Sequence, residues 1–517
     1  MQLVRVRGVR LLAGDRPFYF AGANCHYLMT HAADVNQRPL VTEVLDDASR
    51  LNLTVIRCWA FCDGTDEWNA LHPEPGKFNE TVLVGLDWLV QEAGRRGIRL
   101  LLALTNYWAD YGGMPAYVRW RYGILDRTQH DYEKHPTSLF YTDPHCQAIF
   151  RRAVSTVVNR INSLTGVPYT QEPAILGWEL ANEPRCEGPD GNQVLQHWVA
   201  STADFVRELD PNHLITVGLE GFFGPSTPEL MAHNPYESAA RHGADFAAIF
   251  AHPSLDFASI HLYPDQWCPL DSSPMQLMSF MRTWIQGHAT LCGEARLRKP
   301  LVLSEFGKRD PNSYHGRDCV YDVNRAAAFQ EVLDCCRELA LSGGPLVGVC
   351  AWLLAAKQYP DYDGYTLKLG TAVVPAPLGP ERETEGELQP VVESRNTEGG
   401  RGATTRIAEG CQACNMGPFR GTDAAGTPMY PLPDKEELAV RLLRQYGEDM
   451  SQLCVHAAGM ETGRGDWESG QRMAVAAQLG GGGAAEPAAG LNGGSGFLSE
   501  WLARCCGLPR KGSAGPP

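Results

Sequence analysis

Short apolar stretches recur along the first two thirds of the chain, separated by segments with helical spacing. Each stretch is rich in leucine, β-branched and aromatic residues and lacks the strict alternation of a half-exposed strand. Such continuous apolar character is typical of parallel strands that helices cover outside and packed side chains fill inside. The predicted strands span residues 18–24, 53–61, 99–106, 175–183, 214–221, 257–264, 300–307 and 348–354.

The segments between these strands carry apolar residues at helical spacing, although the one after the fifth strand is less clear. Eight alternations in about 350 residues favour an α/β fold of the (β/α)8 TIM-barrel type with enlarged loops. An open doubly wound sheet usually has fewer strands. The predicted helices span 40–51, 82–97, 145–165, 192–209, 273–291 and 322–341.

The pattern changes after the eighth strand. The segment of about 371–402 is rich in proline, glycine and charged residues, so we expect a long inserted loop there. Helical spacing over 403–415 predicts the eighth barrel helix, which would end the catalytic domain, residues 1–416. We expect residues 417–517 to be a low-complexity, weakly structured tail with one amphipathic candidate at 434–450.

Charge and composition narrow the possible partners. The formal net charge is -15 and the sequence pI is about 5.5, with no basic stripe, so a nucleic-acid partner is not expected. No window approaches the roughly 18 consecutive apolar residues of a membrane span. The first residues carry charges throughout and do not resemble a signal peptide. A neutral substrate suits this acidic chain best.

Polar and aromatic residues gather where the predicted strands end, which is the working face of a parallel barrel. Buried polar groups are costly unless they are paired, so a convergent site explains them better than coincidence does. These residues are Arg57, Trp59, Asn106, Trp108, Asn182, Glu183, His261, Tyr263, Glu305 and Trp352.

Two carboxylates on different strands suit the hydrolysis of a glycosidic bond. One must carry a proton for the leaving oxygen, and the other must be ionised to attack the anomeric carbon. We expect Arg57 and Tyr263 to keep Glu305 ionised, whereas burial and the neighbouring anion raise the pKa of Glu183. The flat indoles of Trp352, Trp108 and Trp59 would form walls on which sugar rings stack.

Other residues near Glu183 have more ordinary interpretations. Glu179 lies four residues earlier on the same strand, so we expect it to point into the barrel and pair with a buried donor. Glu187 follows Pro184 in a loop and is expected to be solvated. Packing alone is the expected role of Trp178 and is an open alternative for Trp59.

An ordered series of motifs resembles glycoside hydrolase family 5, and within it the endo-1,4-β-mannanases of plants and fungi. The resemblance covers about residues 5–370. Two departures are Tyr107, which stands where the family commonly has asparagine, and a loop after strand eight that is longer than expected. The motifs are FYFAGANCHYLM, VIRCWAF, YWADYGG, LGWELANEPRC, VGLEGFFG, DFASIHLYPDQW, KPLVLSEFGK and YDGY.

The resemblance implies that Glu183 is the acid/base and Glu305 the nucleophile of a retaining double displacement. It also implies that Asn182 binds the 2-hydroxyl at the cleavage subsite. Arg57 and Tyr263 should orient Glu305.

The resemblance further implies that His261 lies beside the acid/base and that Trp352 floors the subsite before the scissile bond. Trp108 should stack farther toward the non-reducing end. Arg185 matches an arginine that in some members contacts sugar on the leaving-group side.

We therefore expect a monomeric, extracellular hydrolase of internal β-1,4-mannosidic bonds in mannan, glucomannan or galactomannan, with no metal or organic cofactor. Two alternatives stay open at this stage. One is a β-1,4-glucanase or transglycosylase that uses the same site. The other is a barrel that binds polysaccharide without cleaving it.

Overall fold

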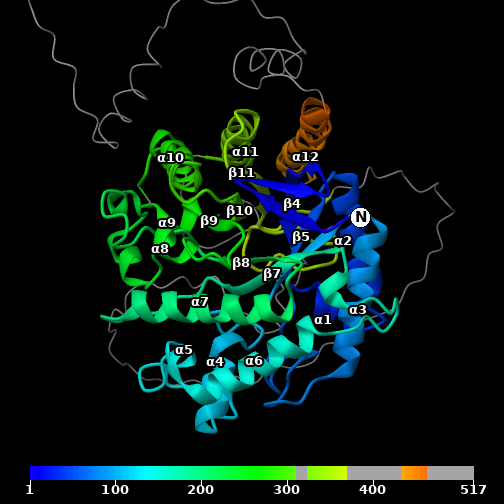
Figure 1. Cartoon of the computed structure of the whole chain (residues 1–517), viewed down its shortest axis with the longest axis vertical. Coiled ribbons are helices and arrows are strands. Elements are labelled where there is room, and N and C mark those ends of the chain that lie inside the picture. Colours follow the sequence, from blue (N-terminus) through cyan, green and yellow to red (C-terminus); the bar gives the residue numbers. More distant parts are fainter. Residues whose placement is uncertain (270, 310–322, 370–432, 463–517) are drawn as a thin grey trace, which may run out of the picture.

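Eight parallel strands form a barrel at the centre of the molecule (Figure 1). The computed structural model describes residues 1–269, 271–309, 323–369 and 433–462. The barrel strands are β4 (Phe20–Asn24), β5 (Val55–Trp59), β6 (Arg99–Ala103), β7 (Ile175–Asn182), β8 (Leu214–Gly218), β9 (Ala258–Leu262), β10 (Leu301–Phe306) and β11 (Leu346–Ala351). Every residue of these strands is buried, as their continuous apolar sequences predicted.

The strands pair in the order β8-β7-β6-β5-β4-β11-β10-β9. Hydrogen bonds then join the two ends of this row: Asp256 N donates to Ile215 O at 2.8 Å, and His261 N donates to Glu220 O at 3.0 Å. The sheet therefore closes nearly completely on itself. This arrangement confirms the predicted (β/α)8 barrel.

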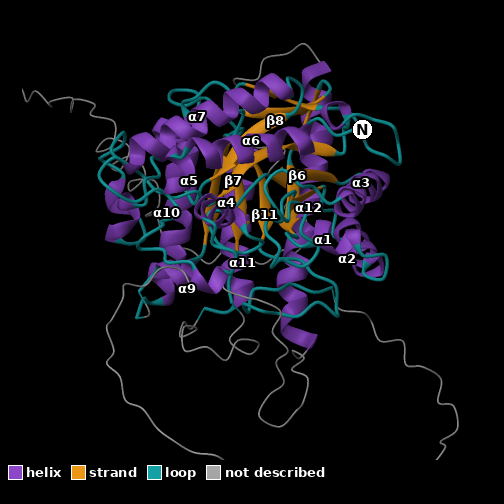
Figure 2. Cartoon of the chain, turned by 90° about the horizontal axis from the view of Figure 1, so that it is seen from below, coloured by secondary structure: helices purple, strands orange, loops and turns teal. Residues whose placement is uncertain are grey.

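Helices surround the barrel on its outer side, as Figure 2 shows. The predicted helices are present as α2, α3, α6, α7, α10 and α11, and the segment after β8 holds two short 3-10 helices and the short α8. The helices are α1 (Leu28–Ala33), α2 (Arg38–Arg50), α3 (Glu80–Arg95), α4 (Gly113–Tyr122), α5 (Leu139–Thr142), α6 (Pro144–Val158), α7 (Gly191–Leu209), α8 (Phe246–Phe250), α9 (Pro264–Trp267), α10 (Pro274–Cys292), α11 (Arg325–Leu341) and α12 (Pro433–Thr462).

Helix α6 shows how local sequence sets its ends. The side chain of Asp143 accepts hydrogen bonds from the first free backbone N–H groups, and Pro144 occupies the first helical position. The helix ends at Val158, before the predicted residue 165. Beyond it the Asn162 side chain accepts from Leu164 N at 2.9 Å, a local turn that competes with a continued helix.

Helix α12 supplies the outer cover next to α11. It packs against α11 and against strand β4, and the two helices lie side by side in Figure 1. Arg337 Nε of α11 donates to Asp449 at 2.7 Å, and Tyr19 N, just before β4, donates to Cys454 Sγ at 3.2 Å.

This helix contains the amphipathic candidate at 434–450. The candidate is confirmed as a helix, and its apolar face is buried against the barrel. The predicted eighth helix at 403–415, the insertion at 371–402 and the domain boundary at 416 lie outside the described residues.

A small antiparallel sheet precedes the barrel. It consists of β1 (Val4–Arg7), β2 (Arg10–Ala13) and β3 (Arg16–Pro17), and β3 leads directly into β4. This sheet therefore lies at the amino end of the barrel strands, opposite the face where their polar ends meet. In the described residues, no helix is long and apolar enough to cross a membrane.

Candidate active site

Arg57 is the centre of a buried polar network in the barrel. It projects from β5 and is fully buried. Its Nε and one terminal nitrogen donate to the two oxygens of Glu179 at 2.8 and 2.6 Å, and its other donors reach Asn24 at 2.8 Å and Asn182 at 2.5 Å. It also donates to Oε1 of Glu305. All these partners come from barrel strands, so the strand framework fixes the guanidinium.

The interaction of Arg57 with Glu179 confirms that this glutamate is a buried support. Burial acts to lower the pKa of Arg57, but the charges and hydrogen bonds of Glu179 and Glu305 outweigh it and raise that pKa. The space beside the pair is filled: a Cβ added at Gly218 would lie 2.6 Å from a Glu179 oxygen and 3.0 Å from an Arg57 nitrogen. Glycine at this position lets the ion pair lie against the backbone of β8.

Glu305, on β10, accepts two strong hydrogen bonds. One comes from Arg57, and the other comes from the Tyr263 hydroxyl, which donates to Oε2 at 2.5 Å. Its pKa is nevertheless raised, because burial and the negative charge of Glu183 outweigh the stabilising influence of His261, Arg57 and Tyr263. The two donors hold the carboxyl group in one orientation.

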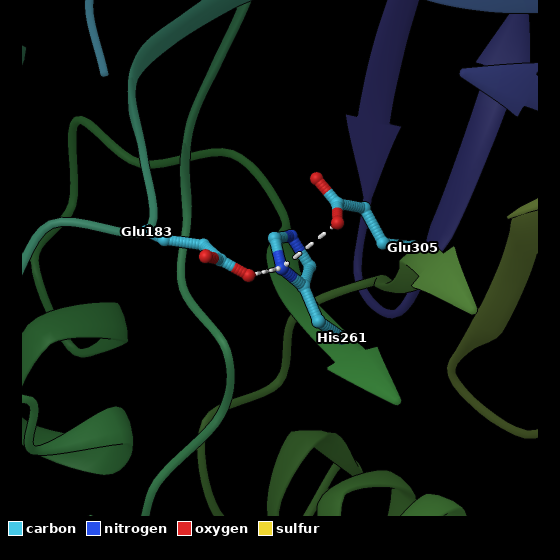
Figure 3. Close-up of side chains that lie close together, drawn as sticks. All are labelled: Glu183, His261 and Glu305. Atoms are coloured by element: carbon cyan, nitrogen blue, oxygen red, sulfur yellow. Dashed lines mark hydrogen bonds and ion pairs between the residues drawn. The ribbon is translucent and has the colours of Figure 1, made fainter. Parts of the chain in front are cut away.

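Glu183 lies immediately after β7 in a left-handed backbone conformation, with φ of 44°. Residues other than glycine rarely adopt this conformation, and when they do it is often at a functional site. The Trp108 indole donates to Oε2 at 2.7 Å, and His261 Nδ1 lies 2.7 Å from Oε1 (Figure 3). These contacts aim the carboxyl group toward the middle of the barrel mouth.

His261 links the two carboxyl groups. Its Nδ1 lies 2.7 Å from Glu183 and 3.5 Å from Oε2 of Glu305, so it stands between them in Figure 3. Burial acts to lower the pKa of His261, but the charges of Glu305 and Glu183 and the hydrogen bond to Glu183 raise it. The three groups therefore titrate as one system.

The pKa of Glu183 is lowered to about 2, opposite to the sequence-based expectation. Burial acts to raise it, but the hydrogen bond and charge of His261, the charge of Arg185 and the Trp108 indole outweigh burial. The reason for the difference is spatial: Nδ1 of His261 lies 2.7 Å from Glu183 Oε1. This contact gives a proton a short path between the two side chains.

Arg185 is buried and paired, not exposed to the cleft as a free cation. It donates from Nε and a terminal nitrogen to Glu220 at 2.8 and 2.5 Å, and its guanidinium carbon lies 4.9 Å from the centre of the Trp108 ring. Trp108 is thus held between this cation and Glu183. Its predicted stacking against sugar, and the predicted sugar contact of Arg185, stay predictions.

Trp59 ends β5, and Trp352 follows β11 directly. Trp352 is partly exposed, and its indole nitrogen donates to Asp363 at 3.1 Å. Trp59 is buried, packs against Phe61, and has the Arg57 guanidinium 4.9 Å from its ring centre. The geometry thus supports Trp352 as a wall open to a ligand and gives Trp59 mainly a packing role.

Two further side chains at this face were not singled out from the sequence. Glu220 follows β8 inside the motif VGLEGFFG, so its position after a strand was a signal that could have identified it. His26 follows β4 and stacks on Trp352, with ring centres 5.2 Å apart and planes 7° apart. Trp178 packs inside as expected, and its indole donates to Asp210 at 2.8 Å.

The same three groups, Glu183, His261 and Glu305, are close enough to hold a metal ion by distance alone, since one ligand atom of each lies within 4.8 Å of the others. However, the oxygens of Glu305 already accept from Arg57 and Tyr263. A buried guanidinium beside the carboxylate also opposes a second cation. The arrangement suits proton transfer and nucleophilic attack better than metal binding.

Comparisons with known proteins assign the chain to a family. The family described as "GH family 5 beta-mannosidase-like" matches residues 1–386. A mannan endo-1,4-beta-mannosidase 1 from Oryza sativa subsp. japonica is 38% identical over 372 residues, which are 71% of this chain and 82% of the relative. The enzyme of the same name from Solanum lycopersicum is 40% identical over 357 residues, 68% of this chain and 84% of the relative.

Solved structures show the same fold. An endo-beta-1,4-mannanase from Thermotoga petrophila is 32% identical with a TM-score of 0.57, covering 68% of this chain and 73% of that one. An endo-1,4-beta-mannanase from Rhizomucor miehei is 30% identical with a TM-score of 0.57, covering 71% of this chain and 94% of that one. The chain therefore belongs to the β-mannosidase-like proteins of glycoside hydrolase family 5 and is a glycoside hydrolase.

Proposed function

We propose that this enzyme hydrolyses internal β-1,4-mannosidic bonds of mannan-type polysaccharides with retention of configuration. The observation that carries the proposal is the close approach of Glu183 and Glu305, whose nearest ligand oxygens lie within 4.8 Å of each other. Retaining glycosidases place their carboxyl groups about 5–5.5 Å apart, whereas inverting ones leave about 6.5–9.5 Å for a water molecule. The names of the matched relatives support mannan as the substrate.

In the first step, an oxygen of Glu305 attacks the anomeric carbon while the bond to the leaving sugar oxygen breaks. Glu183 gives that oxygen a proton. This proton reaches Glu183 from His261 across their hydrogen bond. A glycosyl ester of Glu305 results. Arg57 and Tyr263 hold the attacking carboxylate in line.

In the second step, a water molecule takes the place of the leaving sugar. Glu183, now a carboxylate, removes a proton from this water, whose oxygen attacks the anomeric carbon. The ester bond to Glu305 breaks, and the sugar leaves with its original configuration. Asn182 is fixed by Arg57 and also donates to Asn106 Oδ1 at 3.0 Å, so its amide is in place to contact the 2-hydroxyl in both steps.

The test compares release of reducing ends from linear mannan and from carboxymethylcellulose, with Glu305→Gln as the inactive control. We expect cleavage of mannan, little of cellulose, and a loss of roughly 10⁴-fold or more in kcat for the variant. Equal cleavage of the two polymers would instead support a β-1,4-glucanase. Unchanged hydrolysis by Glu305→Gln would contradict the mechanism.

A product profile on mannohexaose, followed by NMR, reports endo action and the configuration of the new reducing end. An initial α-anomer would contradict retention, since the substrate linkage is β. The monomeric state and the extracellular location expected from the sequence stay predictions, and size-exclusion chromatography and fractionation of source cells test them.

A further inference from the structure

A row of aromatic rings leads away from the active site on the Trp352 side. We call the rings of Trp352, His26, Tyr27, His31 and Trp68 the aromatic track. Successive ring centres lie 5.2 Å apart from Trp352 to His26, 5.4 Å to Tyr27, 5.2 Å to His31 and 5.1 Å to Trp68. Each ring thus contacts the next, from the catalytic cleft to the surface.

All members of the aromatic track come from segments that follow β4, β5 and β11, at the carboxyl ends of three neighbouring barrel strands. They therefore share the face on which Glu183 and Glu305 lie. Tyr27 is fully buried and meets His26 and His31 edge to face, whereas His26, His31 and Trp352 are partly exposed.

Trp68 ends the aromatic track and is 51% exposed. The loop that carries it is tied down: Asn69 Nδ2 donates to the carbonyl of Thr30 at 2.9 Å, and Glu67 accepts from Arg127 at 3.1 Å. A large indole held at the surface by a fixed loop gains little from folding, because half of it stays in water. Its position is better suited to contact a ligand.

Burial disfavours a positive charge on the two histidines of the aromatic track. Burial lowers the pKa of His26 to about 3, with smaller lowering effects from His31 and Arg57. Burial also lowers the pKa of His31, partly offset by its hydrogen bond to the Tyr27 carbonyl and the charge of Asp34. Neutral flat rings suit the apolar faces of uncharged sugars, and they offer no cation to an anionic polymer.

We propose that Trp68 is a stacking platform for a distal sugar of an uncharged β-1,4-linked mannan chain that runs along the aromatic track from Trp352. The inference rests on the proposed function, because it extends that substrate beyond the cleavage site. Continuity with the catalytic cleft identifies the occupant as the same polysaccharide. Trp68 thereby makes the enzyme favour long chains over short ones.

The experiment measures kcat/KM for mannohexaose and for mannotriose in the wild type, Trp68→Ala, Trp68→Phe and Tyr122→Ala. Loss of one stacked ring is expected to lower the ratio of the two kcat/KM values roughly 10-fold in Trp68→Ala. Trp68→Phe, which keeps an aromatic face, should restore part of the ratio. Tyr122 is a matched control because it is 42% exposed but its ring contact is with His135, off the aromatic track.

Thermal unfolding of each variant checks that it is folded. An unchanged ratio in Trp68→Ala, or an equal fall in Tyr122→Ala, would overturn the inference. These outcomes differ from failure of the proposed function: if the wild type cleaves neither mannan nor mannohexaose, the substrate assignment fails. If it cleaves both and the ratio does not move, only the platform fails.

Discussion

Glu179 and Glu183 lie four residues apart along one strand and its end, yet the structure treats them very differently. Glu179 is completely buried and accepts two hydrogen bonds from one guanidinium, that of Arg57. Glu183 is partly accessible and accepts single hydrogen bonds from His261 and Trp108. The guanidinium of Arg57 always carries its positive charge. A histidine, by contrast, can give up and take back a proton near neutral pH.

This difference distinguishes a glutamate that stabilises the fold from one that takes part in catalysis. Breaking a buried ion pair leaves an uncompensated charge in the interior, so the region around Glu179 resists change. The region around Glu183 stands at the end of β7, where the backbone turns and a substrate can enter. Four substitutions test this division, in order of the effect that we expect.

The largest effect is expected from Glu183→Gln. The variant keeps the shape and the contact with Trp108 but cannot donate or accept the catalytic proton. We expect kcat/KM on mannan to fall about 10³–10⁴-fold, with a smaller loss of unfolding free energy than in Glu179→Gln, because His261 can release its proton once its partner is neutral. Steady-state kinetics and urea denaturation measure the two quantities. Activity above a tenth of the wild-type value would remove Glu183 from the acid/base role.

Glu179→Gln should lower the free energy of unfolding more than Glu183→Gln does. The amide replaces a carboxylate that both pairs with Arg57 and offsets its charge. We expect the variant to lose about 3 kcal/mol of unfolding free energy, at the low end for a broken buried pair, because Glu305 still balances the guanidinium. Urea denaturation gives the value. A loss below about 0.5 kcal/mol would show that the pair contributes nothing to the fold.

His261→Asn tests the shared proton through the pH dependence of stability. The pKa of His261 is raised in the folded state, so its stabilising contribution is fully present below about pH 6.5 and is lost as the pH rises through the folded pKa. The difference in unfolding free energy between wild type and variant should therefore shrink above pH 6.5. Denaturation curves from pH 5.5 to 9 follow it. A difference that stays constant over this range would mean that His261 is not charged in the folded site.

The smallest effect is expected from Glu187→Gln, the third glutamate of the same segment. Its side chain is 67% exposed and lies 3.3 Å from His242 Nδ1. Exposed ion pairs contribute little, so stability should stay within about 0.5 kcal/mol and mannan hydrolysis should be unchanged. This variant is the control for the other glutamates, and a marked loss of activity would place Glu187 in the site after all.

The barrel and most residues of the candidate site could be predicted from the sequence. The eight strands were visible because buried parallel strands are apolar throughout, and Arg57, Glu183, His261, Tyr263 and Glu305 do converge as their strand-end positions indicated. The division of protons between Glu183 and Glu305 was not predictable. It depends on a contact of 2.7 Å between His261 and Glu183, and strand-end spacing carries no such detail.

The packing of the segments after β11 was not predictable for a different reason. Two of them have helical spacing, 403–415 and 434–450, and periodicity alone does not say which surface a helix covers. Helix α12 covers α11 and the outside of the barrel with a buried face that includes Leu443 and Tyr446. The role of His26 was likewise not predictable. It comes from stacking on Trp352, which lies far from His26 in the sequence.

The position of α12 has a consequence for the synthesis of this protein. Strand β4 is synthesised about 400 residues before the helix that covers it, which begins at Pro433 and brings Cys454 to Tyr19. On a ribosome, the outer side of β4 therefore lacks this cover until residues 433–462 have emerged. Exposed apolar surfaces of this kind promote aggregation and chaperone binding, so the arrival of α12 removes one such surface from the nascent barrel.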